Sequence, residues 1–174
     1  MISLDAIFPL FMRYYNVETH DIEPPFDARA DFESHNEQYV LVKAAHIADI
    51  DSNEHIFFKQ CKELGTDELL MLHEKAWEQG QAMINPYYGH KNTDISLLIL
   101  ADGISDEACK MISKLRHSAV YKFGLYGYSN YRLVVVDTAS EKTYCNRNGR
   151  TLKSVVNNFI IKQYTIHKKE DEEV

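Results

Sequence analysis

The sequence lacks the motifs that mark several common enzyme classes. Its seven glycines form neither of the loops, GxGxxG and GxxxxGK[ST], that cradle phosphate groups. No GxSxG nucleophile elbow is present. The three cysteines are scattered and form no CxxC pair, which indicates reduced thiols and excludes a disulfide framework. We therefore expect no cofactor, and the sequence leaves open whether the chain is an enzyme.

Long hydrophobic runs are absent as well. No apolar stretch approaches the roughly 20 residues that span a bilayer. The apolar start, MISLDAIFPLFMRYY, has no basic residue before its apolar run and no small-residue cleavage site after it. A docking helix explains this start better than a signal peptide does. These absences predict a cytoplasmic protein with no membrane partner.

The composition that is present is that of an ordinary globular protein, 45% hydrophobic and 26% charged. A length of 174 residues suits one domain with a sizeable core. We predict that this domain spans 1–167. The remaining segment, 168–174, has the sequence KKEDEEV, which predicts a charged, disordered tail.

Hydrophobic periodicity predicts an α+β fold. Apolar residues three and four apart indicate helices at 3–15, 66–84, 105–117 and from 151 onward. Alternating patterns indicate strands at 17–22, 26–33, 39–50 and 55–59, linked as a meander. We predict a single mixed, mainly antiparallel sheet with a βαβ unit, flanked by about four helices.

Two later strands have uniformly apolar sequences, which indicates burial on both faces. They lie at 95–100 and 133–136. The first is followed by the helix at 105–117 and by a strand that begins at Val120, with Phe123 and Leu125 alternating on one face. This order predicts a right-handed βαβ unit with parallel strands. A shorter strand is expected at 142–145.

Charge is divided unevenly along the chain. Residues 1–109 contain 7 Lys/Arg against 20 Asp/Glu, whereas residues 110–153 contain 9 against 2. Such a basic segment can face an anionic partner. It can equally face the acidic part of the same chain or of a second copy, and the sequence leaves these alternatives open.

Tyrosines lie between the basic residues of this segment, and basic groups beside aromatic platforms suit an anionic ligand or a nucleic acid. A protein partner or a homo-oligomer is a further expectation. Our leading hypothesis is a non-enzymatic binding or interaction module with a basic, aromatic face. The candidate binding residues are Lys122, Tyr126, Tyr128, Arg132, Arg147 and Arg150.

The alternative hypothesis is a nuclease-like enzyme, active or degenerate. The predicted order of elements resembles the core of the restriction-endonuclease-like fold, which implies catalytic roles for Asp31 and Lys43. The acid that this family places two residues before its lysine is replaced by Leu41. Without that carboxylate a catalytic metal loses a ligand.

A group of His and Asp residues at 46–55 is split between two strand faces by alternation, so we expect no metal site.

Four short motifs resemble those of an uncharacterised family of small bacterial proteins. They are GISDE at 103–107, FGLYG at 123–127, RLVVVD at 132–137 and YCNRNG at 144–149. The resemblance implies a bacterial, cytosolic context. It implies no activity.

Overall fold

The computed structural model describes residues 2–32, 52–88, 90 and 92–172, with the side chains of the last helix described as far as Ile161. Its helices are α1 (Leu4–Phe11), α3 (Thr66–Met83), α4 (Asp106–Ile112) and α5 (Arg150–Glu172), with a 3-10 turn η1 (Lys122–Gly124). Its strands are β1 (Asn16–Glu18), β2 (Ala28–Phe32), β3 (Ser52–Leu64), β4 (Asn92–Ile104), β5 (Ser118–Val120), β6 (Tyr128–Asp137) and β7 (Lys142–Cys145). None of the described helices is long and apolar enough to cross a membrane.

The described strands form one mixed sheet, in the order β1-β2-β3-β4-β6-β5, with β7 paired to β6. The β3–β4 and β4–β6 pairs are parallel, and the other four pairs are antiparallel. The predicted α+β fold with a mixed, mainly antiparallel sheet is confirmed. The charged tail predicted to begin at Lys168 begins within α5, and the predicted domain boundary stays a prediction.

Two details of the predicted topology are wrong. In the predicted meander, the strand at 39–50 lay between the strands now seen as β2 and β3. In the structure β2 pairs directly with β3. The segment 39–50 itself lies outside the described residues. The strand at Val120 was expected to run parallel to β4, but β5 is an edge strand antiparallel to β6. The parallel partner of β4 is β6, and β3, α3 and β4 form a second βαβ unit that the periodicity did not reveal.

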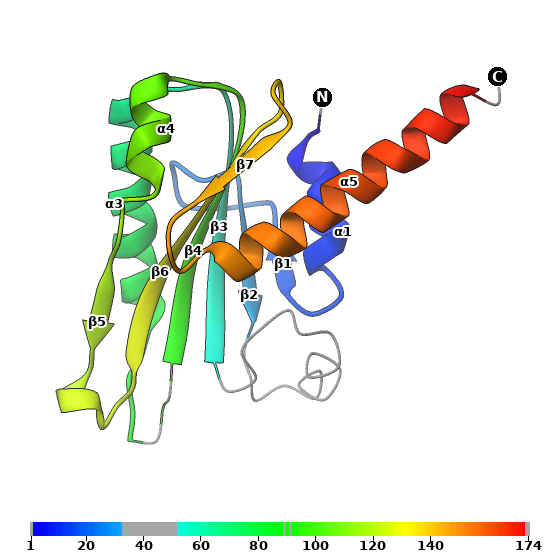
Figure 1. Cartoon of the computed structure of the whole chain (residues 1–174). Coiled ribbons are helices and arrows are strands. Elements are labelled where there is room, and N and C mark those ends of the chain that lie inside the picture. Colours follow the sequence, from blue (N-terminus) through cyan, green and yellow to red (C-terminus); the bar gives the residue numbers. More distant parts are fainter. Residues whose placement is uncertain (1, 33–51, 89, 91, 173–174) are drawn as a thin grey trace.

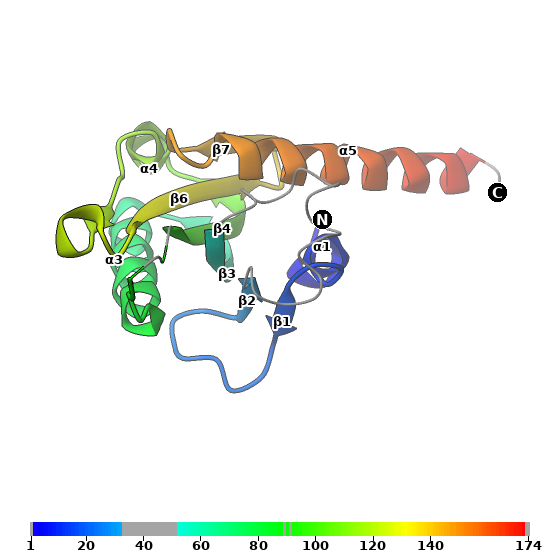
Figure 2. The same ribbon diagram turned by 90° about the horizontal axis from the view of Figure 1, so that it is seen from below.

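The sheet separates two hydrophobic cores, because its central strands are apolar on both faces. Leu98 and Val134 face α1 and α5, whereas Leu97 and Val135 face α3 and α4. Figures 1 and 2 show the two helix pairs on opposite sides of the strands. Burial on both faces explains why β4 and β6 contain Ile, Leu and Val in unbroken runs.

The connection between β5 and β6 is a protruding hairpin and not the continuous strand that alternation predicted. Figure 1 shows it extending beyond the sheet at the end where β6 begins. Tyr121 anchors the start of the hairpin to α3. The Tyr121 hydroxyl donates to Gln81 Oε1 of α3 (3.0 Å) and lies 2.8 Å from Ser129 Oγ. The hairpin is therefore held against α3 while its far end points into solvent.

Candidate functional site

Three of the six predicted binding residues meet at this hairpin. Lys122, Tyr126 and Tyr128 lie within or beside η1, together with apolar side chains that the sequence analysis assigned to a strand. We define the tip surface as Val120, Lys122, Phe123, Leu125, Tyr126 and Tyr128.

Large apolar side chains of the tip surface are exposed to solvent. Phe123 is fully exposed (104%), and Val120 and Leu125 are 68% and 62% exposed. A hollow of about 340 Å³ lies beside them, lined in part by Pro86, Val120 and Tyr126. Clustered exposed apolar side chains on a globular protein mark interaction sites.

The backbone of the hairpin presents Phe123 in a strained but ordered conformation. Lys122 and Phe123 have φ values of 46° and 57°, a left-handed region that favours glycine, and Gly124 and Gly127 also have positive φ. Two backbone N–H groups close the hairpin, since Tyr121 donates to Gly127 O (2.9 Å) and Gly124 donates to Tyr121 O (2.9 Å). Strain of this kind, held in place by surrounding hydrogen bonds, concentrates at functional sites.

Arg132 does not belong to this surface, so the prediction that it joins an exposed basic face is wrong. Its Nη1 lies 3.3 Å from Glu54 Oε1, and its Nη2 forms an ion pair with Asp94. Both carboxylates are buried, at 2% and 1% exposure. The register of the sheet explains the contact, because Glu54 pairs with Asp94, and Arg132 lies two residues beyond the partner of Asp94 on the same face.

This buried cluster connects the strands β3, β4 and β6 with the segment between α1 and β1. From that segment, the Tyr15 hydroxyl donates to Glu54 Oε2 (2.7 Å). From β4, Ser96 Oγ donates to Glu54 Oε1 (2.5 Å). Burial raises the pKa of Asp94 to about 6, while Arg132 opposes this shift and Glu54 adds to it. Hydrogen bonds from Asn92 and Asn130 also oppose the shift but do not cancel it. The cluster therefore contains one carboxylate that is poorly compensated for its loss of water.

Arg147 and Arg150 are exposed, but on different elements from the tip surface. They lie at the connection between β7 and α5, and Figure 2 shows α4, β7 and the start of α5 along one side of the molecule. Among the described residues, Arg132 is the one Lys or Arg of 110–153 within ion-pair distance of a carboxylate. Pairing with the acidic part of the same chain is therefore seen for Arg132 and for no other Lys or Arg of this segment among the described residues.

The alternative nuclease-like residues are only partly described. Asp31 accepts hydrogen bonds from Arg29 Nε (2.9 Å) and lies 2.7 Å from His55 Nδ1, and Arg29 also reaches Glu18 (2.7 Å). Lys43 lies outside the described residues. The nuclease-like hypothesis stays a prediction.

An aromatic stack beside α3 was not predicted from the sequence. The His117 ring lies between His73 (centroids 4.3 Å apart) and Trp77 (5.0 Å), and both pairs are parallel within 13°. Burial, assisted by His117, lowers the pKa of His73 to about 4. The i, i+4 spacing of His73 and Trp77 on a helix was the available signal.

Glu74 brings a carboxylate to this stack, and the three groups are a candidate metal site. Its oxygens lie 3.8 Å from His73 Nε2 and 3.4 Å from His117 Nε2. A metal binds imidazole nitrogen in the plane of the ring. Two rings stacked in parallel cannot both aim at one ion, so a ring would have to turn before these residues chelate a metal.

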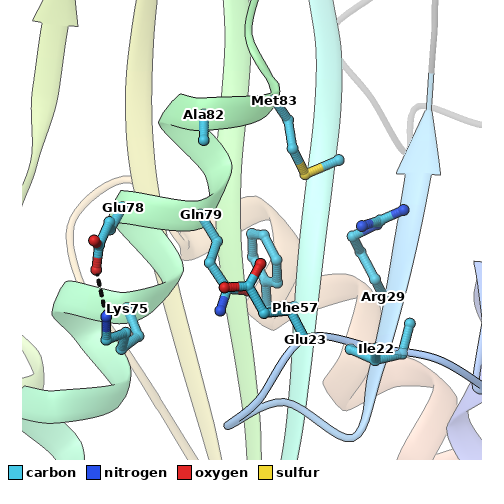
Figure 3. A pocket seen from close by; sticks show the side chains of 9 residues that line it. All are labelled: Ile22, Glu23, Arg29, Phe57, Lys75, Glu78, Gln79, Ala82 and Met83. Carbon is cyan, nitrogen blue, oxygen red and sulfur yellow. Dashed lines mark hydrogen bonds and ion pairs between the residues drawn. The ribbon is translucent and has the colours of Figure 1, made fainter.

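A pocket of about 250 Å³ opens between α3 and the segment that leads into β2. Figure 3 shows it between the helix and the strands, with Phe57 behind and Met83 above. Its charged groups are mostly paired, since Lys75 donates to Glu78 (2.6 Å) and Arg29 contacts carboxylates outside the pocket. We call it the α3–β2 pocket, and its main lining residues are Ile22, Glu23, Arg29, Phe57, Gln79 and Met83.

Comparison with known proteins gave one match. No curated protein and no solved structure matches the chain. The sequence model of one family matches residues 3–158, which confirms the expected resemblance to an uncharacterised family. The chain belongs to the family described as Domain of unknown function (DUF8052).

Proposed function

We propose that the chain is a non-enzymatic interaction module that docks on a partner through its tip surface. The observation that carries this proposal is the full exposure of Phe123 on a strained, hydrogen-bonded hairpin. A folded chain gains nothing in stability from an apolar side chain in water. The left-handed φ of a non-glycine residue costs it about 1–2 kcal/mol. Binding supplies a reason for both features.

The hairpin has the physical properties of a binding anchor. Burying a Phe or Leu side chain contributes about 1.5–3 kcal/mol each, so Phe123 and Leu125 together suffice for a measurable contact. The backbone is already ordered by its own hydrogen bonds, which reduces the entropy lost on binding. Tyr126 and Tyr128 add the amphipathic aromatic area that is common in binding hot spots.

Site-specific photocrosslinking tests this proposal. We would introduce p-benzoyl-phenylalanine in place of Phe123 in the full chain and irradiate cells that express it. The expected result is one or a few discrete adducts, which disappear when Leu125→Asp is added. Ser140 is exposed in the turn between β6 and β7 and provides the control position.

Equal adducts at positions 123 and 140, or none at 123, would contradict the proposal. Phe123→Ser removes the proposed anchor and tests whether its loss affects binding without affecting the fold. Since the side chain contacts solvent, this substitution should leave the melting temperature unchanged within about 2 °C, a shift that corresponds to less than about 0.5 kcal/mol.

A further inference from the structure

We infer that the partner of the tip surface is a second copy of the chain, whose α3–β2 pocket receives Phe123. This inference rests on the proposed function and names its partner. It follows from three matches between the two surfaces, in shape, in charge and in position.

The shapes match because one surface is a projecting aromatic ring and the other is a hollow with an aromatic wall. The pocket volume of about 250 Å³ exceeds the roughly 150 Å³ of an engineered apolar cavity, in another protein, that takes up benzene. Phe57 lies at the back of the pocket, and Ile22 and Met83 flank the opening (Figure 3). Phe57 is only 1% exposed, so a ring entering from outside would pack mainly against Ile22 and Met83, with Phe57 at the bottom of the pocket.

The charges match as well. The segments that frame the pocket, 18–31 and 66–83, contain nine Asp/Glu against two Lys/Arg. The segment that carries the tip, 113–131, contains three Lys/Arg and no acidic residue. Within the described part of the chain, Glu23 in the pocket and Lys122 on the tip have no ion-pair partner within 4.0 Å. Opposite potentials on two surfaces favour their encounter and fix their register.

The positions require two copies. The tip extends from β5, at one edge of the sheet, whereas the pocket lies beside β2, with β3, β4 and β6 between them. A tip therefore cannot enter the pocket of its own chain. Because the two surfaces differ, the association is head to tail. An open assembly therefore keeps one free tip at one end and one free pocket at the other, unless a ring closes.

Analytical ultracentrifugation of two single variants tests this geometry. Phe123→Ser removes the anchor but keeps the pocket. Ala82→Trp fills the pocket from an exposed helical position but keeps the tip. One hairpin is a small contact, so we expect a dissociation constant on the order of 0.1 mM for the wild type.

We expect the weight-average mass of the wild type to rise with concentration and each variant to stay monomeric. An equimolar mixture of the two variants should form a dimer and nothing larger, because only one tip and one intact pocket can meet. Lys122→Glu should weaken association at least tenfold, and Glu23→Lys in the same chain should restore it.

A wild type that stays monomeric at about 1 mM would overturn the inference, as would variants that associate like the wild type. Crosslinks from position 123 to a different protein, together with a monomeric wild type, would leave the proposed function standing and remove this partner. Absence of any specific crosslink at 123 would remove both.

Discussion

At the scale of single residues, burial shifts the pKa values of Asp94 and His73 in opposite directions. Asp94 has a raised pKa of about 6, and His73 has a lowered pKa of about 4. Each shift has burial as its largest cause. Both groups therefore affect the free energy of unfolding between about pH 4 and pH 6.5.

Asp94→Asn should remove one of these effects. Folded Asp94 holds a proton that the unfolded chain releases between pH 3.8 and about 6, so its contribution to stability falls as pH rises through this window. We expect the wild type to lose about 3 kcal/mol relative to the variant between pH 4 and pH 7. Urea denaturation at several pH values measures this difference. A difference independent of pH would contradict the shifted pKa.

His73→Phe should remove the opposite effect while preserving the aromatic stack. Unfolded His73 binds a proton below about pH 6.5 that the folded side chain binds only near pH 4, so its contribution to stability rises with pH. Relative to the variant, the wild type should gain up to about 3 kcal/mol between pH 4 and pH 7. The chemical shifts of His73 during an NMR titration provide an independent check, and a midpoint near 6.5 would refute the expectation.

The positions of the candidate residues were predictable from the sequence only in part. Lys122 and Tyr128 are exposed and Tyr126 is half-buried, and their role in binding stays a prediction. Arg132 could not be placed, because its partners Glu54 and Asp94 are 78 and 38 positions away in sequence and meet it only through the parallel register. Long-range pairing of this kind leaves no local signal.

At the scale of elements, α3 packs tightly against the central strand β4. A Cβ atom added to Gly80 would lie 2.6 Å from Cγ2 of Ile95, a side chain that is fully buried. This glycine sets how near the helix approaches the sheet. It therefore sets the position of the α3 residues that line the α3–β2 pocket. It also sets the position of Gln81, which accepts the hydrogen bond from Tyr121.

Gly80→Ala should destabilise the protein although alanine favours helices. The gain in helix propensity is about 1 kcal/mol, and overpacking costs about 1–3 kcal/mol. The added Cβ would meet three buried atoms of Ile95, so we expect the upper part of this range and a net loss of up to about 2 kcal/mol. Thermal and urea unfolding measure it. In an Ile95→Ala background the same substitution should cost less, because the obstructing atoms are gone. Additive effects in the double variant would show that the contact is not the cause.

Elements with a strong period were predicted well, and elements shaped by special backbone angles were not. The helix expected at 66–84 is observed as α3, since its apolar stripe repeats over five turns. The strand expected to begin at Val120 and to include Phe123 and Leu125 is wrong, because β5 ends at Val120. Phe123 and Leu125 alternate as strand residues do, which led to the wrong prediction. Positive φ angles at Lys122 and Phe123 turn the chain there, and composition does not reveal them.

At the scale of the whole molecule, the sheet places the acidic and basic parts of the chain at its two edges. The strand order puts β1 and β2 at one margin and β6 and β5 at the other. The uneven charge along the sequence thus becomes a charge difference across the molecule. The charge imbalance was visible in the sequence. Where the two charged parts lie in the molecule depends on the parallel β3–β4–β6 arrangement, which hydrophobic periodicity alone did not predict.

A chain that ends at residue 167 should fold like the full chain. The family match ends at residue 158, and the apolar contacts of α5 described in the structure involve Leu152, Val156 and Ile160. Circular dichroism and fluorescence should show one coincident thermal transition, with a melting temperature within about 2 °C of the full chain. Two separated transitions would contradict a single domain, and a large loss of stability would move its boundary.

The stacking of His117 on Trp77 has an experimental consequence. Trp77 is the single tryptophan of the chain, and His117 immediately precedes the strand that leads to the tip. Indole emission depends on the groups that contact the ring. The unlabelled protein therefore contains its own optical reporter, read in one fluorescence channel, for whatever displaces the segment entering the hairpin.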